Sequence, residues 1–100
     1  EFEGHLALYP PGAFYRKHLD QFQGTRHRLV TVILYLNPDW REAGGGQPRI
    51  HPHPPDEGPF PDPLPGAGRL VCCLSGPFPH EVLPARRERL SITGWFRQRD

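Results

Sequence analysis

A histidine and an aspartate two residues apart, His18 and Asp20, are the first residues of this chain that suggest metal chemistry. Side chains alternate along an extended strand, so residues two apart project from the same face. Two such Cα atoms lie about 7 Å apart, which allows an imidazole and a carboxylate to bind one ion. A third ligand is still needed, and the chain offers several candidates, His80 among them. The alternative for the pair alone is a solvated histidine beside an acid.

The segment at residues 89–96 carries a second pattern with chemical meaning. Alternation places four of its residues on one face of a strand: Arg89, Ser91, Thr93 and Trp95. A barrel interior lined by arginine, serine and threonine is costly unless it holds a charged polar ligand. The planar fork of Arg89 suits a carboxylate, and Tyr35 would add a phenolic hydroxyl to it. The alternative makes Arg89 one more surface charge after Arg86 and Arg87.

Strands must position these residues, and the pattern of the chain is that of an all-β protein. Short apolar or alternating segments between proline and glycine turns predict strands at residues 5–9, 14–20, 28–36, 49–51, 69–74, 80–83 and 89–96. Seven or eight such strands predict a β-sandwich or barrel.

Two of these strands carry more specific expectations. Both faces of residues 28–36 are apolar, which predicts a central strand covered on both sides, with Thr31, Ile33 and Tyr35 on one face. If residues 80–83 pair with 89–96 across the connection between them, His80 and Arg89 lie side by side.

The composition is that of one globular domain, which we expect to span residues 1–100. A net charge of +1 and the lack of a basic stripe argue against a nucleic-acid or membrane partner. The sequence contains no Met, so we expect it to be a piece of a longer protein. Cys72 and Cys73 are adjacent and cannot form an ordinary disulfide, which favours a reducing cytoplasm and a role as small buried hydrophobes.

A proline-rich loop at residues 52–65 interrupts the strand pattern. It holds seven prolines and predicts an exposed segment, the most mobile part of the chain. Only Phe60 and Leu64 offer it apolar anchors.

Four further histidines have ordinary interpretations. His51 and His53 form a second His-x-His pair, but no third ligand lies in register, which favours surface histidines. His27 lies in a polar turn. His5 shares the parity of Tyr9 and would reach the interior on that basis, although we interpret it as a strand-end residue.

The order and spacing of these residues resemble one protein family. The likeness rests on His18-x-Asp20, residues 28–40, Gly45-Gly46, Pro79-His80-Glu81-Val82, and Arg89 with Ile92-Thr93-x-Trp95. Over about residues 5–96 the chain resembles the Fe(II)- and 2-oxoglutarate-dependent oxygenases of the prolyl-hydroxylase type. The likeness is to bacterial members and to the hypoxia-inducible-factor prolyl hydroxylases. One such motif is weak evidence, but several in register are strong.

The resemblance implies a double-stranded β-helix, or jelly roll, without the helices that precede it in the family. It implies Fe(II) held by His18, Asp20 and His80, with one side of the metal open. Arg89 matches the residue that pairs with the distal carboxylate of 2-oxoglutarate, and Tyr35 matches the tyrosine that assists it. Further matches line the pocket: Thr93, Trp95, Ile33, Val82 and, at its mouth, Tyr9.

The function that this resemblance implies is hydroxylation of a C–H bond, above all in a prolyl residue of a protein substrate. Dioxygen is the second cosubstrate, and the resemblance also admits ascorbate. One alternative is hydroxylation of a small molecule or of another side chain. Another is a non-catalytic jelly-roll module that binds a partner, with the proline-rich loop as a polyproline ligand. Nucleic-acid demethylation fits less well, because no basic stripe with interleaved aromatic residues is present.

Overall fold

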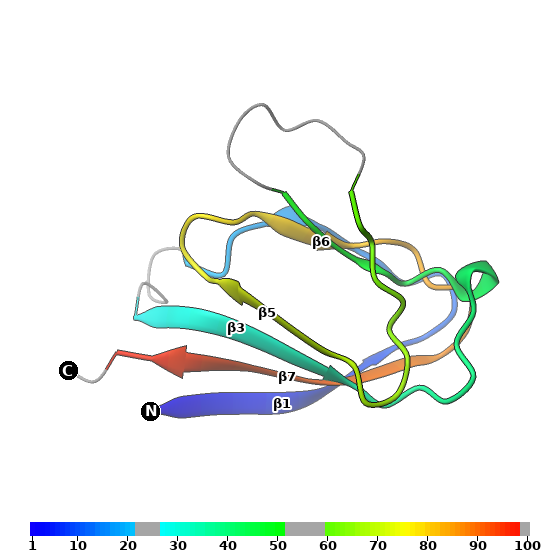
Figure 1. The fold of residues 1–100 in the computed structure, drawn as a ribbon, viewed down its shortest axis with the longest axis horizontal. Helices are drawn as coiled ribbons and strands as arrows, with labels where there is room; N and C mark the ends of the chain where they lie inside the picture. The colour runs from blue at the N-terminus through cyan, green and yellow to red at the C-terminus, as the bar shows by residue number, and fades with distance from the viewer. Residues whose placement is uncertain (22–26, 52–59, 99–100) are drawn as a thin grey trace.

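The computed structural model describes residues 1–21, 27–51 and 60–98, which form two antiparallel sheets (Figure 1). The strands are β1 (Phe2–Tyr9), β2 (Tyr15–His18), β3 (Arg28–Tyr35), β4 (Pro48–Ile50), β5 (Leu70–Leu74), β6 (His80–Val82) and β7 (Arg89–Arg97). Within these residues the helical content is one 3-10 turn, η1 (Glu42–Gly44). None of the described segments forms a helix long and apolar enough to cross a membrane. The expected all-β class is confirmed.

The strands alternate between the two sheets along the chain. Odd-numbered strands form a four-stranded sheet in the order β1-β7-β3-β5, and even-numbered strands form a three-stranded sheet in the order β2-β6-β4. In Figure 1 the three-stranded sheet lies above the four-stranded one. This winding is that of a double-stranded β-helix, so the expected jelly roll is confirmed.

Alternation along β3 and β7 separates an inner polar row from an outer apolar row. β7 lies between β1 and β3, and its register pairs Thr31 with Trp95 and Tyr35 with Ser91. All four of these side chains are buried. On the outer face, Leu34 is 36% exposed. The prediction that residues 28–36 are covered on both sides is therefore wrong for the outer face among the described residues.

The connection between β6 and β7 crosses from one sheet to the other. β6 pairs with β2 and β4, whereas β7 pairs with β1 and β3. Ala85 anchors the crossing, because its carbonyl accepts a hydrogen bond from the Gly12 amide and its amide donates to Ala13. The prediction that His80 and Arg89 lie side by side in one sheet is wrong, and they reach the interior from opposite sheets.

The end of the proline-rich loop is packed against β4. Residues 52–59 lie outside the described residues, so the expectation of mobility there has no structural test. From Phe60 onward, Asp62 pairs with Arg49 (Oδ1–Nε 2.9 Å), and Pro65 is fully buried. The prediction of an exposed segment with only apolar anchors is wrong for residues 60–65, because an ion pair holds it.

Two further expectations need correction. His51 is buried rather than solvated, since its Nε2 lies 2.7 Å from a carboxylate oxygen of Glu81 and its ring contacts Phe60. Cys72 is exposed rather than buried, because it lies on the outer face of β5, while Cys73 is half-buried on the inner face. Both thiols are free. His53 lies outside the described residues.

Candidate metal centre and cavity

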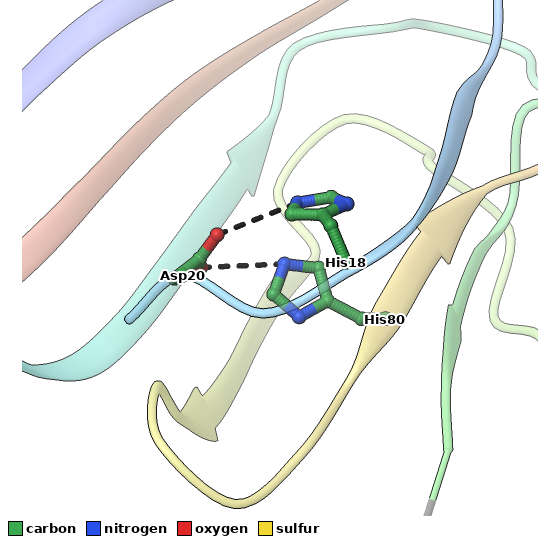
Figure 2. A group of neighbouring side chains, drawn as sticks. All are labelled: His18, Asp20 and His80. Carbon is green, nitrogen blue, oxygen red and sulfur yellow. Dashed lines mark ion pairs between the residues drawn. The ribbon is translucent and has the colours of Figure 1, made fainter. Parts of the chain in front are cut away.

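His18, Asp20 and His80 converge on one point between the sheets (Figure 2). Their ligand atoms all lie within 4.8 Å of one another. His18 ends β2 and His80 begins β6, and the two residues are direct partners in the three-stranded sheet. Asp20 lies beyond the end of β2, in a bend that turns its carboxylate toward both rings. The convergence predicted from the sequence is present, although a bend rather than strand alternation places Asp20.

Backbone carbonyls orient both imidazole rings. The Nδ1–H group of His18 donates to the Arg16 carbonyl at 2.7 Å, and that of His80 donates to the Phe78 carbonyl at 3.2 Å. With Nδ1 of each ring bonded to a carbonyl, Nε2 is the nitrogen that faces Asp20 and the atom that each ring offers to a metal. The two Nε2 atoms face Asp20, at 3.4 Å from Oδ1 for His18 and 3.3 Å from Oδ2 for His80. Metal-binding histidines are commonly held in this way.

Asp20 is a buried carboxylate stabilised by donors from both sheets. Its Oδ2 accepts a hydrogen bond from Thr31 Oγ1 at 2.5 Å and another from Trp95 Nε1 at 2.9 Å. Burial alone would raise the pKa of Asp20, but hydrogen bonds from the two histidines, Thr31 and Trp95 lower it far below its usual range. Asp20 therefore stays ionised inside the protein.

The Asp20 carboxylate also changes the pKa of His80. Burial alone would lower the pKa of His80, but hydrogen bonding and the charge of Asp20 outweigh it and raise the pKa. Two imidazole nitrogens and one carboxylate oxygen are the donor set of non-haem iron(II) sites with open coordination positions. The residues present fit such an ion.

A cavity of about 220 Å³ extends from this centre between the two sheets. Its lining includes the five positions that the sequence predicted to line a pocket: Tyr9, Ile33, Val82, Thr93 and Trp95. Arg89 also lines it. Tyr35 is fully buried behind this surface and contacts Arg89.

Arg89 is a buried cation without a carboxylate partner among the described residues. It is 2% exposed, its Nε donates to the Gly46 carbonyl at 2.7 Å, and its Nη2 donates to the Tyr35 hydroxyl at 3.2 Å. Burial lowers the pKa of Arg89, and burial raises the pKa of Tyr35 to about 12, so the hydroxyl keeps its proton. A buried guanidinium is costly unless an anion compensates it. The alternative of a surface charge is wrong, and Arg89 fits an anionic ligand.

The paired glycines before β4 allow two close approaches, one by the Arg89 side chain and one by the Pro84 carbonyl. Gly46 has a φ of +69°, and a Cβ there would lie 3.0 Å from Arg89 Cδ. Gly45 has a φ of +63°, and a Cβ there would lie 2.2 Å from the Pro84 carbonyl oxygen. Only glycine adopts these positions without strain. Gly46 therefore makes room for the Arg89 side chain, and Gly45 makes room for the Pro84 carbonyl oxygen.

Five cavity residues were not predicted as site residues: His5, Ala7, Tyr15, Arg28 and Thr31. The Tyr15 ring lies 3.8 Å from the His18 ring, and the Arg28 guanidinium lies 3.7 Å from the Trp95 ring centre. A bulge between Arg28 and Val30 shifts Arg28 onto the inner face, and no sequence signal marks that bulge. The sequence did carry a signal for His5, because alternation places it on the same strand face as Tyr9, which faces the interior.

The family model of the 2OG-Fe(II) oxygenase superfamily matches residues 4–97. The human protein Egl nine homolog 1 is 40% identical over 94 residues, which cover 91% of this chain and 21% of that protein. The crystal structure of a Pseudomonas putida prolyl-4-hydroxylase has a TM-score of 0.89 and 56% identity, covering 99% of this chain and 53% of that one.

A second solved structure carries a peptide. It is a prolyl hydroxylase from Trichoplax adhaerens in complex with a hypoxia-inducible-factor oxygen degradation domain peptide fragment. Its TM-score is 0.82 at 36% identity, covering 95% of this chain and 43% of that one. The chain thus spans about half or less of the length of each of these relatives.

Proposed function

This chain belongs to the 2OG-Fe(II) oxygenase superfamily, and we propose that it is the single-domain core of a dioxygenase that hydroxylates a prolyl residue in a protein or peptide. One observation carries this proposal: two histidines, an ionised carboxylate and a buried arginine with no carboxylate partner among the described residues face the same cavity. The names of the relatives supply the prolyl target, since both solved structures reported above are prolyl hydroxylases.

The proposed iron ligands are His18 Nε2, His80 Nε2 and the Asp20 carboxylate. Their fixed ring orientations and the hydrogen bonds to Asp20 leave little to reorganise when a metal arrives. Bound Fe(II) would supply the redox chemistry that couples decarboxylation of 2-oxoglutarate by dioxygen to hydroxylation of a C–H bond. The protein contributes position and exclusion of water.

The proposed 2-oxoglutarate site has Arg89 and Tyr35 at its base. The Nη atoms of Arg89 would bond the distal carboxylate, and the protonated Tyr35 hydroxyl would donate a further hydrogen bond. Thr93 adds a hydroxyl to the same cavity, and Ile33 and Val82 add apolar walls. Tyr9 closes the site beside Arg89, with its ring 4.9 Å from the guanidinium.

Several finer points complete the proposal. Trp95 and Tyr15 offer aromatic faces beside the metal centre, which suit the apolar ring of a proline. Two free cysteines accord with a reducing cytoplasm. Ascorbate is proposed as a reductant that keeps the iron ferrous. The near-neutral charge gives no reason to expect nucleic acid or membrane as a partner.

The full-length protein, incubated with Fe(II), 2-oxoglutarate and a panel of proline-containing peptides, provides the test. We expect succinate release together with a mass gain of one oxygen on a prolyl residue of at least one peptide. A mass gain on a different side chain or on a small molecule would favour those alternatives. Absence of both iron binding and 2-oxoglutarate turnover would leave the non-catalytic binding module.

A further inference from the structure

A buried chain of three oxygen-bearing side chains leads away from the proposed metal centre. Ser75, in the turn after β5, is completely buried, and its Oγ lies 2.9 Å from Oγ1 of Thr31 on β3. Thr31 is 2% exposed, and its Oγ1 lies 2.5 Å from Asp20 Oδ2. Ser75 does not line the cavity and has no part in the proposed reaction.

The single proton of Thr31 determines the direction of both hydrogen bonds. At the 2.5 Å contact, Thr31 Oγ1 donates its proton to Asp20 Oδ2. Thr31 then has only lone pairs to offer Ser75, and Ser75 must be the donor at the 2.9 Å contact. Consecutive hydrogen bonds of one direction strengthen each other in a buried setting.

This direction matters for the carboxylate that faces the metal. Oδ2 of Asp20 accepts hydrogen bonds from both Thr31 and Trp95. Oδ1 lies 3.4 Å from Nε2 of His18, and Oδ2 lies 3.3 Å from Nε2 of His80. The two donors therefore hold the carboxylate facing the ring nitrogens of both histidines.

We propose that Ser75 is a positioning residue for the metal centre. Its hydroxyl donates to Thr31, strengthens the hydrogen bond from Thr31 to Asp20 Oδ2 and thereby holds the carboxylate in the orientation that faces both histidines. The proposal rests on the proposed function insofar as His18, Asp20 and His80 hold a metal.

The thiol of Cys73, the cross-strand partner of Thr31 in β5, is a second group beside the Thr31 hydroxyl. Burial, followed by the charge of Asp20, raises the pKa of the Cys73 thiol to about 11. A neutral thiol is a weak donor and does not replace the serine hydroxyl. Loss of the Ser75 hydroxyl would therefore weaken the hydrogen bond from Thr31 to Asp20.

Co(II) binding to the full-length protein, measured by its visible absorption without 2-oxoglutarate, tests this role. We expect Ser75→Ala to weaken Co(II) binding about three- to tenfold, the effect of one buried hydrogen bond. In a Thr31→Val background the same substitution should change the affinity no further, because Ser75 acts through Thr31. Thr31→Ser, which keeps the hydroxyl, should retain the wild-type affinity.

Ser91→Ala is the matched control. Ser91 is equally buried, but its Oγ lies 3.4 Å from Thr93 and makes no contact with Asp20, so Co(II) affinity should not change. If Ser75→Ala does not fold, Ser75→Cys keeps the volume with a weaker donor and should show the same direction of loss.

Three results would overturn the role of Ser75: wild-type affinity in Ser75→Ala, an equal loss in the Thr31→Val background, or an equal loss in Ser91→Ala. A wild-type protein that binds neither Co(II) nor Fe(II) would instead overturn the proposed metal centre itself. The two failures are therefore distinguishable.

Discussion

Removal of the Arg89 guanidinium should abolish most of the affinity for 2-oxoglutarate while leaving the metal bound. Arg89 is 2% exposed and lacks a carboxylate partner among the described residues, so a ligand carboxylate would form a charge-assisted, largely desolvated pair with it. Such hydrogen bonds contribute about 1.5–3 kcal/mol. Arg89→Ala should therefore weaken 2-oxoglutarate binding about ten- to a hundredfold or more.

Arg89→Lys separates charge from geometry. The ammonium keeps the charge, but it lacks the fork that reaches the Gly46 carbonyl and the Tyr35 hydroxyl together. We expect a smaller loss than for alanine. The assay is calorimetric titration of 2-oxoglutarate into the Mn(II)-loaded full-length protein, which does not turn over.

Arg86→Ala provides the matched control. Arg86 is an exposed arginine of the same connection, and its Nη1 donates to the Ala43 carbonyl at 3.2 Å. Its removal should leave 2-oxoglutarate affinity unchanged. Equal affinities for wild type and Arg89→Ala, in folded protein, would refute the assignment of Arg89 to the cosubstrate.

Further predictions concern the metal centre, the cosubstrate and the packed segment. Asp20→Ala should weaken metal binding by more than about a hundredfold, because loss of a ligand costs more than loss of a residue that hydrogen-bonds to a ligand. The circular dichroism spectrum should stay unchanged. Trp95→Phe keeps an aromatic ring but removes the Nε1 donor to Asp20, so Co(II) affinity should fall about two- to tenfold in the same titration. Tyr35→Phe should weaken 2-oxoglutarate binding about two- to tenfold, and unchanged affinity would exclude its hydroxyl from the site. Asp62→Ala breaks the partly exposed pair with Arg49, and urea unfolding should show a loss of about 0.5–1 kcal/mol.

Much of the fold followed from alternation, because a strand with one buried face leaves no freedom of register. The odd-numbered residues of β7 lie inside as predicted, and so do Thr31 and Tyr35 on β3. The metal ligands came from a resemblance rather than from alternation. The prediction that the side chains of His18 and Asp20 lie close together is correct, but for a different reason, since Asp20 lies in a bend.

The errors share one physical origin, which is that contacts distant in sequence leave no mark on a local pattern. The short connection before β7 favoured a hairpin, but it crosses between sheets. The bulge after Arg28 and the pair between Arg49 and Asp62 depend on partners elsewhere in the chain. The local sequence predicts a surface position for His51 because its carboxylate partner, Glu81, is 30 residues away.

Anaerobic equilibrium dialysis of Fe(II) and 2-oxoglutarate against the full-length protein tests the central claim most directly. Wild type should bind one of each per chain. Arg89→Ala should retain the iron and lose 2-oxoglutarate, whereas Asp20→Ala should lose the iron. Wild-type protein without iron, or Asp20→Ala that retains it, would contradict the assignment of His18, Asp20 and His80 as the metal centre.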